Sequence, residues 1–492
     1  MNEACSGLRP EHKMYYRALI PFVVLVALSI VGLLAPISVP AAAGAPINSG
    51  DTAWLLTAAG LVLLMTPGLS FFYGGMVRTK NVLSTMLQSF IAMAVISIIW
   101  VVVGFSLVFG DSIGGIIGNP TTYGMFRGVG GATNAALSPT IPLVLFALFQ
   151  LKFAIITPAL VSGAFAERVR FSSYMIFISL FTIVIYCPLA HATWNPDGLL
   201  HKWGVLDFAG GTVVHLSAGV AALAGAFMLG PRSDHQRGQH TPPANIPYVL
   251  LGTGLLWFGW FGFNAGSALS ASPLASHAFM TTNMASASAM LSWILFDRML
   301  GRKPSALGAC TGAVVGLVAI TPAAGYVSVG ASIFIGVASS VVSNLVAHGR
   351  SKSALDDTLD VFPCHGVGGM FGMICTGLFA STAINANGAN GLMYGGTTLF
   401  VHHIASLIIV TVSVFCASCL LYKVTNWISP LRVDADQERI GLDISQHGES
   451  FGAEVQIGQL GDLEPALVVA ARSQRETPGK RTAASRVAPY RI

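Results

Sequence analysis

The chain has 492 residues, of which 53% are hydrophobic and only 10% are charged. Soluble domains usually carry about 25% charged residues, so this composition excludes an ordinary soluble protein and indicates a membrane protein. The net charge of +5 comes from short loops and the tail rather than from a basic stripe, which argues against a nucleic-acid partner. Of the seven cysteines, Cys187, Cys310, Cys375, Cys416 and Cys419 fall in apolar runs, without metal-ligand spacing that a partner His could complete, so we expect no disulfide framework, metal site or cofactor.

Residues 1–45 have the pattern of a secretory signal. Arg9, Lys13 and Arg17 precede an apolar run at 18–34, and small residues at 41–45 offer cleavage sites. The alternative is an uncleaved extra helix, because the run is almost long enough to span a bilayer. In either case residue 51 is expected to begin outside the cell.

A transmembrane domain is predicted over residues 51–425. Its apolar runs of bilayer length lie at 51–75, 84–109, 140–166, 171–192, 207–229, 247–269, 274–297, 304–321, 325–347, 361–380 and 397–422. Alternating these from an outside start places nearly every loop Lys and Arg inside, with only Arg127 and Lys202 in outer loops. We therefore predict an all-α polytopic membrane protein of about eleven transmembrane helices, with the C-terminus in the cytoplasm.

The order of the spans suggests two halves of five helices followed by a final helix. The fifth span carries His215 and the tenth carries His365. Because five is odd, the two halves must be inserted in opposite orientations. Inverted repeats with a site at their interface are typical of transporters.

His215 and His365 are titratable side chains inside apolar runs. His215 is expected about 12 Å beyond Asp207, near the middle of the bilayer, where a polar group is by default a functional candidate. Two neighbouring neutral rings can share a proton and give an apolar tube a polar wall. The alternative is that each ring simply bonds to a backbone carbonyl.

Asp207 stands at the start of the helix that carries His215, with two glycines close behind it. A carboxylate in this position caps the first amides and complements the helix dipole. Direct binding of a cation is the alternative. We favour the cap, because a fully exposed carboxylate would hold a cation too tightly for fast passage.

A third group consists of aromatic side chains and one hydroxyl. Its members are Phe149, Phe153, Trp194, Trp260, Phe263 and Ser267. Spacings of three and four place Phe149 with Phe153, and Trp260 with Phe263 and Ser267, on common helix faces. Ring faces and a hydroxyl would attract a small cation. Ordinary membrane packing and an interfacial tryptophan belt are the alternatives.

The cytoplasmic tail is expected at residues 426–492. Residues 431–456 are polar and charged, whereas 470–492 are rich in Arg, Ser, Ala and Thr, a composition typical of disorder. No soluble catalytic domain fits in this tail.

Several of these segments resemble the ammonium transporters of the Amt/MEP/Rh superfamily, in particular the bacterial Amt branch. The main motifs are PGLSFFYGGMVRTKNVLS (67–84), SGAFAERVRFSSY (162–174), DFAGGTVVHLSAGVAALAGAFMLGPR (207–232), GWFGFNAGS (259–267), GACTGAVVGLVAITPAAGYV (308–327), DVFPCHGVGG (360–369) and LRVDADQERIGLDISQHGES (431–450). The resemblance covers nearly the whole chain from residue 51.

The resemblance implies a role for each candidate residue. His215 and His365 would be the twin histidines of an ammonia pore, below a phenyl gate formed by Phe153 and Phe263. The outer ammonium site would be Trp194, Phe149 and Ser267, supported by Asp207 and Trp260. The resemblance further implies transport into the cell across the plasma membrane, a homotrimer, and a PII signalling protein as cytoplasmic partner.

Two features depart from the family pattern. Lys152 is a charge in mid-span beside Phe153, and we expect it to face a subunit contact or to extend its amine towards water. The outer loop before Asp207 is about one residue longer than usual, which affects the placement of Trp194.

Three other functions compete with a permease. An ammonium sensor would be favoured by fused signalling domains, and a channel for a neutral solute would gain little from an aromatic cage. An intramembrane enzyme lacks a nucleophile or second ligand cluster near either histidine. Whether transport moves net charge is left open by the sequence.

Overall fold

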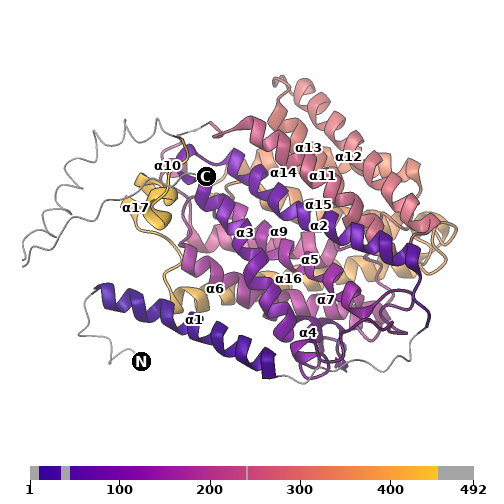
Figure 1. Ribbon diagram of the computed structural model, residues 1–492. Helices are drawn as coiled ribbons and strands as arrows, with labels where there is room; N and C mark the ends of the chain where they lie inside the picture. Colours follow the sequence, from indigo (N-terminus) through magenta and orange to yellow (C-terminus); the bar gives the residue numbers. More distant parts are fainter. Residues whose placement is uncertain (1–9, 35–44, 240–241, 453–492) are drawn as a thin grey trace, which may run out of the picture.

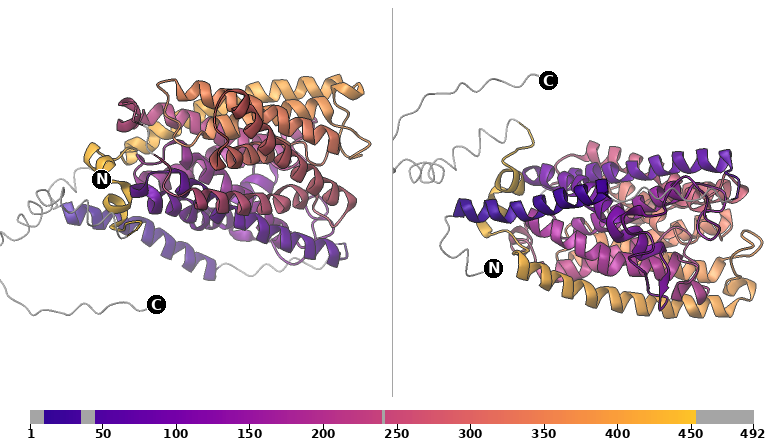
Figure 2. Two further views of the ribbon diagram at one scale, coloured as in Figure 1. Left: turned by 90° about the horizontal axis from the view of Figure 1, so that it is seen from above. Right: turned by 60° about the horizontal axis from the view of Figure 1, so that its bottom comes forward.

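The computed structural model describes residues 10–34, 45–239 and 242–452, which form a bundle of long helices lying side by side (Figure 1). Helix α1 (Pro10–Leu34) lies along the outside of this bundle (Figures 1 and 2). The predicted cleavage sites at 41–45 fall almost entirely outside the described residues, as does the tail beyond residue 452, so the signal peptide stays a prediction.

The helices of the bundle begin and end as follows: α2 (Ser49–Met76), α3 (Val82–Ile99), α4 (Phe105–Phe109), α5 (Leu143–Val161), α6 (Phe171–Phe181), α7 (Cys187–Trp194), α9 (Ser217–Leu229), α11 (Ile246–Ala265), α12 (Pro273–Met299), α13 (Ala306–Ile320), α14 (Val329–Ser351), α15 (Gly368–Phe379) and α16 (Thr397–Ile428). Turns of π-helix lie at η2 (Trp100–Gly104), η5 (Thr182–Tyr186), η6 (Gly211–Leu216), η8 (Phe362–Val367) and η10 (Asp443–His447), and 3₁₀ turns at η1 (Thr79–Asn81), η3 (Gly124–Phe126), η4 (Ser162–Ala164), η7 (Gly266–Ala268) and η9 (Leu392–Tyr394). Short helices α8 (Leu199–Lys202), α10 (Ser233–Gln236) and α17 (Ala435–Ile440) and a hairpin of β1 (Ser112–Ile113) and β2 (Ile117–Gly118) connect or follow them.

A helical segment occupies each of the eleven predicted spans, which confirms the all-α polytopic fold. Within the described residues, nine helical segments are long and apolar enough to cross a membrane. The other two are α12 and α13. Helix α13 is apolar but has only 15 residues, so it is about 22 Å long and shorter than a bilayer core.

Helix α12 is long enough, at 27 residues, but carries many hydroxyl side chains. These side chains face the protein rather than lipid: Thr281 donates to the Ala324 carbonyl and Ser286 to the Ala313 carbonyl. Asn264 of α11 donates to Thr282. Hydroxyl groups bonded between helices are a common way to join membrane helices, so the polarity of α12 reflects its packing.

One end of the bundle collects the loops that were predicted to be cytoplasmic. Glu167 is fully buried and pairs with Arg78 at 2.8 Å and with Arg232 at 2.7 Å. Arg232 also pairs with Asp356, which lies 3.8 Å from Arg168. Burial alone would raise the pKa of Asp356, but hydrogen bonds from Arg232 and the charge of Arg168 hold this pKa well below its usual range. Loops far apart in sequence are thereby tied together.

The described part of the tail docks on the same end (Figures 1 and 2). Asp443 accepts hydrogen bonds from the backbone N–H groups of Leu83 at 3.1 Å and Ser84 at 2.8 Å, and so caps α3. Lys80 donates to the Glu438 and Arg439 carbonyls at 3.1 and 2.5 Å. Residues 431–451 are therefore an ordered part of the fold.

The segments that carry the two histidines cross where the two halves of the chain meet. η6 packs against α15, and η8 packs against α9. A Cβ added at Gly219 would overlap the backbone of Gly366, and one added at Gly369 would lie 2.8 Å from the Gly211 carbonyl oxygen. Glycine is required at both crossings because the two backbones touch there.

Candidate functional site

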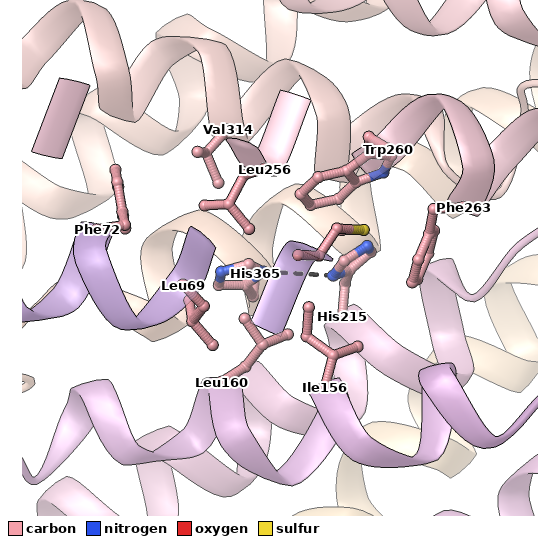
Figure 3. Close-up of a pocket in the computed structure, with 11 residues that line it drawn as sticks. Leu69, Phe72, Ile156, Leu160, His215, Leu256, Trp260, Phe263, Val314 and His365 are labelled. Atoms are coloured by element: carbon pink, nitrogen blue, oxygen red, sulfur yellow. Dashed lines mark hydrogen bonds between the residues drawn. The ribbon is translucent and has the colours of Figure 1, made fainter. Parts of the chain in front are cut away.

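The two histidines predicted to act together do meet. Their Nδ1 atoms lie 3.3 Å apart, and the ring centroids are 5.4 Å apart with planes inclined by 26° (Figure 3). His215 is 1% exposed and His365 is 4% exposed. A bond between two Nδ1 atoms requires a proton on one and a lone pair on the other, so the pair shares one proton along this contact. In the described residues the rings bond to each other, not to backbone carbonyls as in the alternative interpretation.

Both histidines are held by the same local construction. Asp207 lies eight residues before His215, and its carboxylate accepts the backbone N–H groups of Gly210, Gly211, Thr212 and Val213 at 2.8, 2.7, 2.8 and 3.3 Å. This is the predicted cap. Asp207 lines none of the cavities described below, so the structure does not bring it to a solute.

Asp357, which the sequence analysis missed, has the corresponding place eight residues before His365. It accepts the backbone N–H groups of Val361 at 3.1 Å and Phe362 at 2.7 Å. Burial, and then the charge of Asp360, raises the pKa of Asp357 to about 6. The equal spacing of eight residues was visible in the sequence and could have identified Asp357.

A small apolar cavity surrounds the histidine pair (Figure 3). Its volume is about 10 Å³, which is close to the minimum that holds one water-sized molecule. Apart from the two histidines it is lined by Met65, Leu69, Phe72, Ile156, Leu160, Leu256, Trp260, Phe263 and Val314. The only polar groups in this lining are therefore the two imidazoles and the Trp260 indole N–H, which donates to Thr321 at 2.9 Å.

Trp260 lies deeper than expected from the sequence. It stacks on the His215 ring, with centroids 5.2 Å apart and planes inclined by 21°. It was predicted to support the outer site, and it lines the histidine cavity, two turns before Ser267 along α11 and η7. Its contact with His215 fixes the plane of that ring.

Phe153 and Phe263 close the outer side of this cavity. Their rings stack with centroids 4.2 Å apart and planes inclined by 30°. Both are buried, at 1% and 0% exposure. Phe263 lines the histidine cavity, whereas Phe153 lines a second cavity on the other side. The pair therefore separates two compartments.

This outer cavity is wider, at about 370 Å³. Its lining consists of Phe109, Ala136, Leu137, Phe146, Gln150, Phe153, Trp194, Pro196, His201, Phe208, Ser267 and Leu269. Trp194 and Ser267 were predicted to lie here, and the longer outer loop does not displace Trp194. The Ser267 hydroxyl donates to the Phe263 carbonyl at 2.8 Å, which leaves its oxygen lone pairs free to accept. Trp194 meets the Phe153 ring edge-on at 5.8 Å.

Phe149 is the predicted member of this group that does not line the outer cavity. It is fully buried behind Phe153, with ring centroids 5.0 Å apart. A Cβ at Gly266 would lie 2.9 Å from its ring, so the absence of a side chain at Gly266 lets Phe149 turn inward. Gln150, Phe208 and His201 line the cavity in its place and were missed by the sequence analysis.

A third cavity of about 140 Å³ lies on the far side of His365. It shares Phe72, Val314 and His365 with the histidine cavity. Asp360 lines it and is paired with Arg350 at 2.8 Å. The three cavities thus follow one another from the outer loops to the end that bears the ion pairs.

Lys152 lines none of these three cavities. It is 9% exposed and has no carboxylate partner among the residues that the structure describes. The next residues on its helix stripe, Val144 and Leu148, are 41% and 39% exposed. The charge therefore lies beside the pore, at the edge of an exposed apolar surface.

No group of three metal-ligating side chains occurs in the described part of the chain.

Comparison with known proteins places this arrangement in context. A family model described as Ammonium Transporter Family matches residues 53–451. The chain is 46% identical over 407 residues to a putative ammonium transporter of Methanothermobacter thermautotrophicus, covering 82% of this chain and 98% of the relative. It is also 46% identical over 404 residues to an ammonium transporter of Bacillus subtilis, covering 82% and 98%.

Solved structures give the same result. Mep2 of Saccharomyces cerevisiae has a TM-score of 0.74 and 35% identity, covering 79% of this chain and 88% of that one. A structure described as a sensor Amt protein has a TM-score of 0.74 and 30% identity, covering 81% and 98%.

Proposed function

This chain belongs to the ammonium transporter family, and we propose that it recruits ammonium in the outer cavity and passes it as ammonia along the histidine pair. It is a multi-pass membrane transporter rather than an enzyme, in line with its named relatives. The observation that carries the proposal is the stacked Phe153–Phe263 pair between two unlike cavities, one wide and partly polar, the other small and apolar.

Recruitment occurs in the outer cavity. Ring faces of Trp194 and Phe153 attract a small cation by about 0.5–2 kcal/mol each, and the Ser267 oxygen replaces one water. Phe149 supports the Phe153 ring from behind. Asp207 acts indirectly, because its carboxylate is occupied by four backbone N–H groups and its carbonyl holds the Trp194 indole at 3.1 Å.

Before the phenyl pair is passed, ammonium transfers its proton to solvent water in the outer cavity. A bare cation in an apolar cavity loses its hydration without finding an opposite charge, which costs several kcal/mol even after relaxation. Neutral ammonia avoids most of this cost and is about the size that the histidine cavity accepts. Once inside, ammonia lies beside the two imidazoles, and each neutral ring has one nitrogen that donates a hydrogen bond and one that accepts.

The test is an ammonium concentration jump on purified protein in liposomes on a solid-supported membrane, with a pH-sensitive dye in parallel. A saturable current lost in His215→Ala supports charge-coupled transport through the histidine path. Dye-detected flux without current supports movement of neutral ammonia alone. The matched control is His277→Ala, since His277 bonds the Val327 carbonyl and lines none of the three cavities.

A second candidate is an ammonium sensor, favoured by the similarity to the sensor Amt structure. Folded protein that binds ammonium but gives neither current nor flux would overturn the transport proposal in favour of this one.

We also propose a homotrimer in the plasma membrane, with the N-terminus outside after signal cleavage and the tail in the cytoplasm, where a PII signalling protein binds. An exposed apolar groove between the start of α2 and the outer half of α12 supports assembly, because Phe279 and Met280 are 38% and 47% exposed there. Native mass spectrometry in mild detergent, alone and with PII protein, tests both points. Monomers at all concentrations would contradict the first.

A further inference from the structure

A third buried histidine lies outside the pore. His403, near the start of α16, is fully buried and lines none of the cavities described above. Both of its ring nitrogens are engaged: Nδ1 lies 2.8 Å from the Met373 carbonyl oxygen of α15, and Nε2 lies 3.0 Å from the Leu206 backbone nitrogen. The ring therefore bridges α15 to the loop that leads into η6.

The two partners determine the tautomer. A backbone N–H can only donate, so Nε2 must be the acceptor for Leu206. A carbonyl can only accept, so Nδ1 must carry the proton that is donated to Met373. The bridge is thus directional: it uses one donor and one acceptor, and only a side chain with both can replace it.

The loop segment held in this way is central to the outer cavity. Leu206, Asp207 and Phe208 are fixed from three directions, because His403 accepts the Leu206 N–H, Trp194 donates to the Asp207 carbonyl at 3.1 Å, and the Phe208 N–H donates to the Pro322 carbonyl at 3.1 Å. Trp194 and Phe208 line the outer cavity. The Asp207 carboxylate caps the helical segment that carries His215.

We propose that His403 is a positioning residue for the outer ammonium site: its bond to Leu206 holds the 206–208 segment in register with α15, and thereby places Trp194 and Phe208. This inference rests on the proposed function, since it assigns His403 to the affinity of that same site. Loss of the bond releases the segment, and the rings no longer converge. Affinity then falls, whereas the rate along the histidine path changes little.

A matched pair of variants isolates the Leu206 bond. His403→Gln places an amide oxygen near the position of Nε2 and keeps an acceptor for Leu206. His403→Asn is one methylene shorter and keeps a donor near Nδ1 for Met373, but it loses the acceptor for Leu206. Both variants are neutral, polar and smaller than histidine. The control is His402→Ala, which removes the contact of 2.5 Å between Nδ1 and the Trp203 carbonyl in the same loop. Neither His402 nor Trp203 lines the outer cavity or the histidine cavity.

The first readout needs no transport. Hydrogen–deuterium exchange of the peptide that contains residues 203–210 is expected to be faster in His403→Asn than in His403→Gln or the wild type. The second readout is the ammonium concentration that gives half-maximal current. This concentration should rise about tenfold in His403→Asn, which is the change in affinity expected from the loss of one ordinary buried hydrogen bond. The maximal current should stay within about twofold of the wild-type value.

The outcomes separate this inference from the proposed function. Equal exchange in the Asn and Gln variants would overturn the positioning role, whatever the transport data show. Faster exchange with an unchanged half-maximal concentration would also overturn it, because the segment would then move without affecting the site. Absence of current and flux in the wild type would instead contradict the proposed function, while the exchange experiment would still decide whether His403 holds the loop.

Discussion

The Asp207→Asn substitution is expected to destabilise the fold much more than it weakens ammonium binding directly. The carboxylate accepts four backbone N–H groups, two on each oxygen, at 2.7–3.3 Å. An amide keeps one acceptor oxygen and turns an NH₂ group towards the other two donors. Two charge-assisted bonds are lost, each worth about 1.5–3 kcal/mol, so the expected cost is roughly 3–6 kcal/mol.

This cost is large beside the roughly 5–15 kcal/mol that stabilises a typical folded protein. We therefore expect a clear fall in the unfolding temperature of detergent-solubilised Asp207→Asn, measured by tryptophan fluorescence, together with loss of current. The control is Asp111→Asn, since Asp111 is exposed and its carboxylate accepts a hydrogen bond from the Thr122 hydroxyl at 3.0 Å rather than from a set of backbone N–H groups. Its unfolding temperature should be unchanged.

One result would refute this reasoning. If Asp207→Asn unfolds at the wild-type temperature but needs much more ammonium for half-maximal current, then the carboxylate binds the cation itself. The cap would then be incidental, and the alternative interpretation of Asp207 would hold.

Three further predictions follow from the site and its surroundings. Phe153→Ala removes one ring of the wall between the 370 Å³ outer cavity and the histidine cavity, so the osmotic water permeability of liposomes should rise; unchanged permeability would contradict a gate. Asp357→Asn should flatten the pH dependence of stability, because burial and the charge of Asp360 raise the pKa of Asp357 to about 6 and the folded protein therefore binds this proton more tightly than the unfolded chain. The stability of the wild type should fall by up to roughly 3 kcal/mol as the pH rises from about 4 to about 6, and unfolding temperatures measured at both ends of this range check it. Lys152→Met removes a buried charge that has no carboxylate partner in the described residues and should raise the unfolding temperature without changing half-maximal ammonium; a lower temperature would indicate that a neighbouring subunit supplies the partner.

The sequence by itself determined the helical segments and their order. Each span is a long apolar run, and hydropathy is a local property, so the runs were located to within a few residues without knowledge of their neighbours. The cap at Asp207 was predictable for the same reason, because the carboxylate and the amides it binds lie within six residues. His215 and His365 stood out because titratable groups are rare in such runs.

Local patterns were less informative about how deep a side chain lies along the pore and about which cavity it faces. Periodicity placed Phe149 and Phe153 on one face of α5, but only Phe153 reaches the outer cavity, because Gly266 of a distant segment gives the Phe149 ring room to turn inward. The spacing placed Trp260 on one face of α11 with Phe263, but it did not show that Trp260 stacks on His215. Asp357 was overlooked, although its spacing from His365 repeats that of Asp207 from His215.

Only the tertiary structure decided how the two halves meet. The Nδ1–Nδ1 contact of the histidines depends on glycine crossings at Gly219 and Gly369, and the bridge of His403 joins residues almost 200 positions apart in the chain. Such contacts arise from the summed packing of several helices. No single helix encodes them, because the period of a helix specifies which side chains share a face and not which distant residue that face will meet.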